Sequence, residues 1–184
     1  MPVLVVDNMS PFTTDILDCL QTLNIEYIYR KFSEVYDNDL AGCDKVILSG
    51  RRKNSRNINA ANSAIVKQCL QSGKPLLGIC YGAEIIALTL GGSIRKMPFR
   101  VQGPVQIFLS KPNSLTDNKK SISAYESHGY CVARLPRDFE TLASSQHCEH
   151  EIFSSTENKI YATQFHPEKS GSDGLALLQN FAKI

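Results

Sequence analysis

A cysteine flanked by glycines on both sides is the first candidate for chemistry, in the stretch Gly78-Ile79-Cys80-Tyr81-Gly82. Apolar runs on either side place this stretch between a predicted strand and a predicted helix. A nucleophile on such a turn needs small neighbours, because its backbone is strained and crowded. N–H groups at the start of the helix lower the pKa of a thiol and stabilise an oxyanion. The pattern predicts a nucleophile at Cys80, and a structural cysteine after a buried strand would give the same pattern.

A histidine and a glutamate two residues apart are the second candidate, in the stretch 164–168 (QFHPE). A catalytic thiol needs a base within hydrogen-bond reach, and the base needs a group that orients it. The proline between His166 and Glu168 fixes one backbone dihedral angle and restricts the pair. Alone, the stretch could be a surface turn with a solvated acid. Together with Cys80 it predicts a Cys-His-Glu triad.

These two stretches, and the spacing between them, resemble the class I glutamine amidotransferases, in particular the glutaminase domain of GMP synthases, which function in purine biosynthesis. The resemblance runs the length of the chain. Its further motifs are VVDN at 5–8, LSG at 48–50, LGG at 90–92, ESHG at 126–129, LASS at 142–145 with Cys148, and LQNF at 178–181.

The resemblance implies acyl transfer from glutamine. Cys80 would attack the side-chain amide, His166 would carry the thiol proton to the departing ammonia, and Glu168 would hold the useful tautomer of the histidine. Water activated by His166 would then hydrolyse the γ-glutamyl thioester. Ammonia would pass to an ATP-dependent synthetase, and because the chain shows no P-loop, a separate synthetase subunit is implied as the partner.

Other site residues follow from the same resemblance. The N–H groups of Tyr81 and of the loop at Gly50 and Arg51 would form the oxyanion hole. The residues expected to bind the substrate are Glu84, Ser127, His128 and Gly129.

Three residues depart from the family pattern near this site. Glu84 stands where the family has glutamine, and its charge would attract an ammonium group and repel a carboxylate. Arg51 stands where the family has glycine, so its backbone would be strained if φ there is positive. Tyr130 stands where GMP synthases have aspartate.

These departures leave three functions open. The first is a glutaminase subunit in which a nearby arginine offsets Glu84. The second is a stand-alone cysteine hydrolase of a different amide or γ-glutamyl compound. The third is a catalytically silent binding or regulatory subunit, against which the complete triad counts.

The elements that must position these residues fall into two halves. In the first, strands alternate with helices, which predicts a mostly parallel sheet covered by helices on both faces, and the family resemblance makes this a flavodoxin-like α/β fold. The strands are expected at 3–6, 25–29, 45–48 and 75–79, and the helices at about 15–23, from about 59 to a stop at Gly73, and at 83–90. In the second, short alternating runs predict antiparallel strands at 105–109, 121–125, 131–135, 141–144, 152–154 and 160–164, followed by a helix at about 174–182.

Composition bounds the remaining possibilities. The chain of 184 residues, 42% of them hydrophobic, predicts one domain spanning 1–184. A net charge of +2 does not favour nucleic acid, and the basic run 51–53 is expected to be a solvated loop. No apolar run is long enough for a membrane span, and the start has no signal-peptide pattern, so we expect a cytoplasmic protein. The cluster 147–150 (HCEH) invites a metal, but adjacent strand residues point to opposite faces, so we assign no metal and expect no cofactor.

Overall fold

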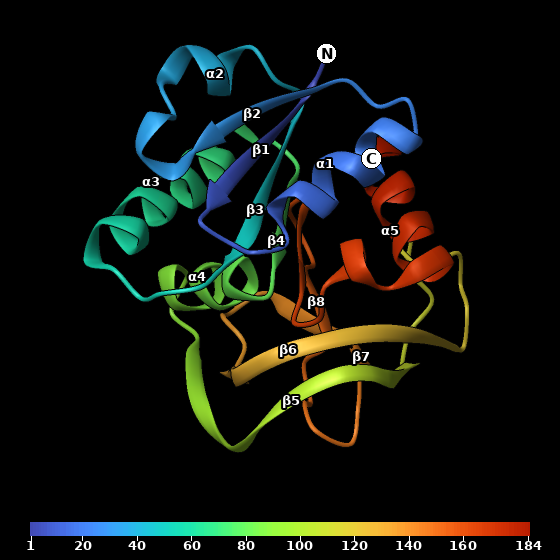
Figure 1. Cartoon of the computed structure of the whole chain (residues 1–184). Helices are drawn as coiled ribbons and strands as arrows, with labels where there is room; N and C mark the ends of the chain where they lie inside the picture. Colours follow the sequence, from blue (N-terminus) through green and yellow to red (C-terminus); the bar gives the residue numbers. More distant parts are fainter.

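The computed structural model describes all 184 residues. A nine-stranded sheet with the order β2-β1-β3-β4-β9-β8-β7-β5-β6 runs through the molecule (Figure 1). The strands are β1 Val3–Asn8, β2 Tyr27–Lys31, β3 Lys45–Arg51, β4 Leu76–Ile79, β5 Ser93–Leu109, β6 Ser121–Arg134, β7 Phe139–Ser144, β8 Ile152–Ser155 and β9 Ile160–Thr163. The helices are α1 Thr13–Thr22, α2 Asp37–Ala41, α3 Arg56–Ser72, α4 Tyr81–Thr89 and α5 Gly171–Lys183, with short 3₁₀ turns η1 at Phe32–Glu34 and η2 at Pro167–Lys169.

The parallel part of the sheet has helices on both faces, as the alternation of strands and helices predicts. Strands β2, β1, β3, β4 and β9 pair in parallel. Along β1, Leu4 and Val6 join a core cluster with α3 and α4, while Val3 and Val5 join a second cluster with α1 and α5. Successive strand residues point to opposite faces, so a continuous apolar run feeds both clusters. The predicted fold class, an α/β domain with antiparallel strands in its second half, is confirmed.

The second half differs in detail from the expected short strands. Segments 121–125 and 131–135 are parts of one long strand, β6, and its partner β5 begins at Ser93 rather than at 105. The register shifts between Lys96 and Val101, and Gly103 has a φ of 112°, so local sequence signals are broken while the long hairpin pairing continues. Strand β9 is antiparallel to β8 as expected and also parallel to β4, which joins the two halves.

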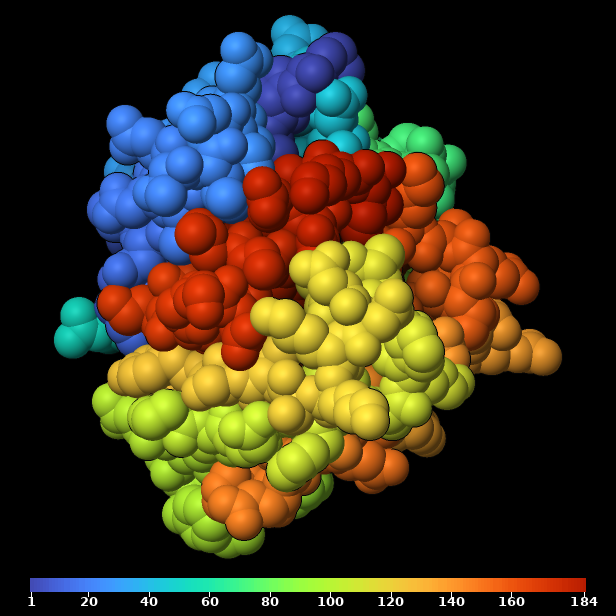
Figure 2. All heavy atoms as spheres, turned by 90° about the vertical axis from the view of Figure 1, so that its right-hand side faces the viewer, coloured from blue at the N-terminus to red at the C-terminus, as the bar shows by residue number.

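Helix α5 closes one side of the molecule. Figure 2 shows it (red) between α1 (blue) and the segment that joins β5 to β6 (yellow). Lys169, just before α5, pairs with Asp15 of α1, and Asp173 of α5 pairs with Lys119 at 2.6 Å. No helix has the length and apolar character needed to cross a bilayer.

Candidate active site

Cys80 lies on a strained turn between β4 and α4. Its backbone has φ 53° and ψ −102°, a conformation that non-glycine residues seldom adopt. Its N–H donates to the carbonyl of Thr163 on β9 at 2.7 Å, which fixes the turn against the neighbouring strand. The side chain is buried except for 8% of its surface. The predicted position of Cys80 between a strand and a helix is therefore confirmed.

Contacts between backbones explain the two glycines around Cys80. A Cβ on Gly78 would lie 2.5 Å from the carbonyl group of Gly82, and a Cβ on Gly82 would lie 2.4 Å from the carbonyl oxygen of Leu48. Real Cβ atoms do not approach backbone this closely, so α4 can pack over β3 and β4 only with glycine at both positions. The spacing of the motif thus follows from the close approach of a helix to two strands.

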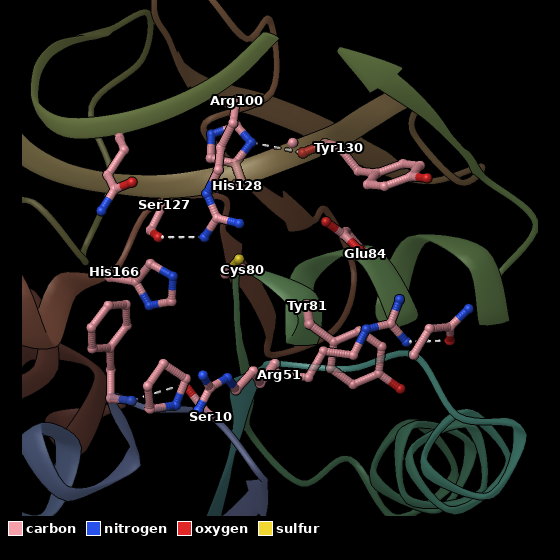
Figure 3. A pocket seen from close by; sticks show the side chains of 16 residues that line it. Ser10, Arg51, Cys80, Tyr81, Glu84, Arg100, Ser127, His128, Tyr130 and His166 are labelled. Carbon is pink, nitrogen blue, oxygen red and sulfur yellow. Dashed lines mark hydrogen bonds between the residues drawn. The ribbon is translucent and has the colours of Figure 1, made fainter.

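His166 and Glu168 form a buried pair next to Cys80. The Nδ1 of His166 lies 2.7 Å from Oε1 of Glu168, and both side chains are almost completely buried. The backbone N–H of His166 donates to Tyr125 of β6 at 2.9 Å, and the ring of Phe12 packs edge-on against the imidazole. A Cβ on Gly50 would lie 3.0 Å from Cε1 of His166 and 3.8 Å from Cβ of Cys80, so the three residues converge. Figure 3 shows the imidazole facing the Cys80 sulfur.

The charges of these groups are coupled. Burial raises the pKa of the Cys80 thiol, while the neighbouring His166 acts in the opposite direction. Burial by itself lowers the pKa of His166, but Cys80 and Glu168 stabilise the imidazolium and leave its pKa well above the usual value. A carboxylate that fixes Nδ1–H leaves Nε2 to exchange a proton with the thiol. The arrangement can therefore move a proton between Cys80 and His166.

A cavity of about 760 Å³ opens in front of Cys80. Of the residues predicted for the site, it brings together Cys80, Tyr81, Glu84, Arg51, Ser127, His128, Gly129 and His166. Gly50 lies directly behind it, against His166, and Glu168 lies behind His166. All ten predicted residues thus meet in one place, although they come from separate parts of the chain.

Glu84 and Arg51 lie close enough to influence each other. Burial raises the pKa of Glu84, and the positive charge of Arg51 is the largest opposing effect, followed by His128 and a hydrogen bond from Gln164. The Arg51 guanidinium lies 4.0 Å from the centre of the Tyr81 ring. Arg51 is not among the residues with positive φ, so the strain considered for it from the sequence is absent. The arginine that could offset Glu84 is one of the departures from the family pattern.

His128 is held from both sides. Its Nδ1 lies 2.7 Å from the carbonyl oxygen of Tyr130, which can only accept, and its Nε2 lies 2.6 Å from Oε2 of Glu126. Burial lowers the pKa of His128, but Glu126 and the Tyr130 carbonyl outweigh it and raise the pKa above the usual value. The wall of the cavity opposite α4 is therefore positively charged near Glu84.

A buried pair of acids lies behind His128. Burial and the charge of Glu126 raise the pKa of Glu151 to about 9, while Ser145 donates to Oε1 of Glu151 at 2.6 Å. Glu151 is therefore protonated at neutral pH and can donate to Glu126, whose oxygens otherwise have no donor apart from His128. The sequence analysis did not identify either acid. The available signal was a charged residue placed directly before an apolar strand segment, 152–153 (IF).

Arg100 is a further cavity residue that the sequence did not indicate. It comes from the irregular part of β5, and its Nη2 donates to Oγ of Ser127 at 3.0 Å. No local pattern marks it, because it reaches the cavity only through the pairing of β5 with β6.

The side chains of the 147–150 cluster diverge. His147 interacts with Gln146 at 3.0 Å, Cys148 is buried, and Nδ1 of His150 lies 2.7 Å from Oγ1 of Thr141. No group of three or more histidine, cysteine or acidic side chains in the chain is arranged to hold a metal ion.

Comparison with known proteins defines the class to which this fold and site belong. The family model described as glutamine amidotransferase class-I matches residues 4–184. The chain therefore belongs to the class I glutamine amidotransferases, a family of cysteine hydrolases.

Within this family the chain is similar to the glutaminase polypeptides of two-part GMP synthases, which carry the letter A in their names. It is 38% identical over 141 residues to the A polypeptide of the glutamine-hydrolyzing GMP synthase of Methanococcus aeolicus, covering 76% of this chain and 72% of that protein. It is 28% identical to the corresponding polypeptide of Methanospirillum hungatei, covering 100% and 96%. A crystal structure from Thermoplasma acidophilum, assigned to the same kind of GMP synthase polypeptide, superposes with a TM-score of 0.89 at 29% identity, covering 100% of this chain and 92% of that one.

Longer relatives match only in part. The glutamine-hydrolyzing GMP synthase of Caldicellulosiruptor saccharolyticus is 39% identical over 123 residues, which is 65% of this chain and 24% of that protein. The chain therefore spans a small part of this relative and most of the shorter A polypeptides.

Proposed function

We propose that the chain is a glutaminase subunit that releases ammonia from the side-chain amide of glutamine and supplies it to a separate synthetase subunit that forms GMP. The observation that carries the proposal is the meeting of Cys80, His166 and Glu168 in one cavity of a class I amidotransferase fold. Metal and cofactor have no role in the proposed reaction.

The proposed reaction begins with the attack of the Cys80 sulfur on the amide carbon of glutamine. The thiol proton passes to Nε2 of His166 and from there to the departing nitrogen, which leaves as ammonia. The remaining γ-glutamyl thioester is attacked by a water that gives its proton to His166, and glutamate leaves as the thiol re-forms. Glu168 acts through His166, since its contact with Nδ1 keeps Nε2 available in both steps.

The oxyanion of each tetrahedral intermediate needs donors that are already in place. The N–H of Tyr81, at the start of α4, and the N–H groups of Gly50 and Arg51, at the end of β3, are proposed for this role. Removing one such donor from a hydrolase typically costs about 3 kcal/mol in activation energy. The packing of Gly50 against Cys80 and His166 supports this assignment, because it brings the end of β3 to the reacting atoms.

The separate partner is proposed from the lengths of the relatives. The chain matches 96% of the Methanospirillum hungatei polypeptide and 24% of a longer GMP synthase, so the proposed synthetase would be a second polypeptide.

The experiment that tests this function combines the chain with the synthetase subunit from the same organism. GMP formation is measured with glutamine or with ammonium chloride as the nitrogen source. Cys80→Ala should abolish the glutamine-dependent reaction and leave the ammonium-dependent reaction unchanged. Cys69→Ala, at a buried thiol of α3 outside the cavity, is the matched control and should retain both reactions. Glutamine-dependent synthesis that survives in Cys80→Ala would refute the proposal.

A further inference from the structure

The cavity in front of Cys80 contains more charge than amide hydrolysis requires. Three arginines line it, Arg51, Arg52 and Arg100, together with the carboxyl group of Glu84. The amide group that Cys80 attacks is neutral, so these charges act on other parts of the substrate.

Glu84 has no ion-pair partner of its own. No lysine, arginine or histidine nitrogen lies within 4.0 Å of its carboxyl oxygens, and the side chain is buried except for 6% of its surface. Burial raises its pKa, while Arg51 and His128 favour the ionised form from a distance. A carboxylate held in this way lacks a close cation, and a substrate ammonium group would supply one.

Arg100 is the arginine that is free to bind an anion. Arg51 already donates to Asn54 at 2.9 Å and Asn59 at 2.7 Å and lies over the Tyr81 ring. Arg52 is shared with a neighbouring hollow that contains Asp7. Arg100 makes one hydrogen bond, to Ser127, and pairs with no carboxylate, so most of its five N–H donors remain available.

Glu84 and Arg100 come from different walls of the same cavity. Glu84 is on α4, one turn after Cys80, and Arg100 is on β5 above Ser127 (Figure 3). We propose that Glu84 binds the α-ammonium and Arg100 the α-carboxylate of a free amino acid, so that the cavity selects a zwitterionic substrate. This assignment rests on the proposed glutaminase function and names the residues that recognise the head group.

The test measures binding, so that it does not depend on turnover or on a partner. Dissociation constants are determined by calorimetry with Cys80→Ala for three ligands: glutamine, glutamine α-amide, which lacks the carboxylate, and 4-carbamoylbutanoate, which lacks the ammonium. Glutamine should bind at least tenfold more tightly than either analogue.

Each second substitution should then remove one preference. Arg100→Gln should weaken binding of glutamine and of 4-carbamoylbutanoate about tenfold and leave that of glutamine α-amide unchanged. Glu84→Gln should remove the advantage of glutamine over 4-carbamoylbutanoate. Lys96→Gln, which removes a positive charge from β5 outside the cavity, should change none of the three constants.

The inference is overturned if glutamine binds no more tightly than the analogues, if none of the three binds, or if both substitutions weaken all three equally. Ammonia release by the unsubstituted chain distinguishes this failure from failure of the proposed function. If Cys80-dependent hydrolysis of glutamine persists without the predicted selectivity, only the head-group assignment is wrong. If glutamine is not hydrolysed even with the synthetase subunit present, the proposed function is wrong.

Discussion

At the scale of single residues, Cys80 combines an unfavourable backbone with an unfavourable site for a charge. A non-glycine residue at positive φ costs on the order of 1–3 kcal/mol, and burial opposes the formation of a thiolate. Both effects are offset locally, by the hydrogen bond to Thr163 and by the neighbouring His166. Such strain persists where the surrounding structure holds it, and here the result is a sulfur presented to a cavity.

Glu168→Gln tests the proposed role of the acid in the triad. The charge of Glu168 raises the pKa of His166, so removing it lowers that pKa. Because the unprotonated imidazole is the base, the acidic limb of the rate profile should move to lower pH. The maximum rate should also fall, roughly 10²–10⁴-fold, since the useful tautomer is no longer enforced. Ammonia release from glutamine across a pH series on both sides of neutrality measures both effects.

Glu140→Gln is the matched control for this prediction. Glu140 lies on β7, pairs with Lys111 at the surface and is absent from the cavity. Its substitution should leave the profile and the rate unchanged. A Glu168→Gln variant that behaves in the same way would support the surface-turn interpretation of the 164–168 stretch.

The residues that the sequence identified are those marked by short local patterns. Glycine spacing indicated Cys80, and a histidine, a proline and an acid in succession indicated His166 and Glu168. Arg100 and Glu151 escaped, because their roles depend on pairing and burial between distant segments. Glu84 was identified, but its environment, with Arg51 and His128 nearby, required the structure.

At the scale of elements, the approach of α4 to the parallel strands determines where the nucleophile lies. Gly82→Ala should destabilise the protein by about 3 kcal/mol or more, because the new Cβ would lie 2.4 Å from a backbone oxygen of β3 that cannot easily move. Chemical denaturation measures the change in the free energy of unfolding. Gly129→Ala is the control: its Cβ would meet nothing within 4 Å, so the change should stay within about 1 kcal/mol. Equal stability of the two variants would contradict the packing account.

Elements with strong periodicity were predictable, and those that depend on long-range pairing were not. The buried strands of the parallel half and the stop of α3 at Gly73, where φ is 65°, agree with the sequence pattern. The short helix α2 was missed, since its five residues offer too little periodicity. The first part of β5 was missed because Pro98, Gly103 and Pro104 interrupt its alternation, although β6 pairs along most of it.

At the scale of the whole molecule, the sheet joins two halves with different tasks. The parallel half supplies Cys80 at the start of α4, and the antiparallel half supplies the wall that contains Arg100 and His128. Strand β9 belongs to both halves and leads directly to His166, so the triad forms only when the halves are joined. This explains why the catalytic and substrate-binding residues are spread from the first third of the chain to its end.

The most direct test of the central claim is ammonia release from glutamine by the purified chain, with Cys80→Ala as the blank. A panel of other amides is measured in parallel. The account predicts release from glutamine that disappears in the blank. Cys80-dependent release from another amide, with glutamine left intact, would contradict the account and make the chain a hydrolase that kept the triad of its family and changed its substrate.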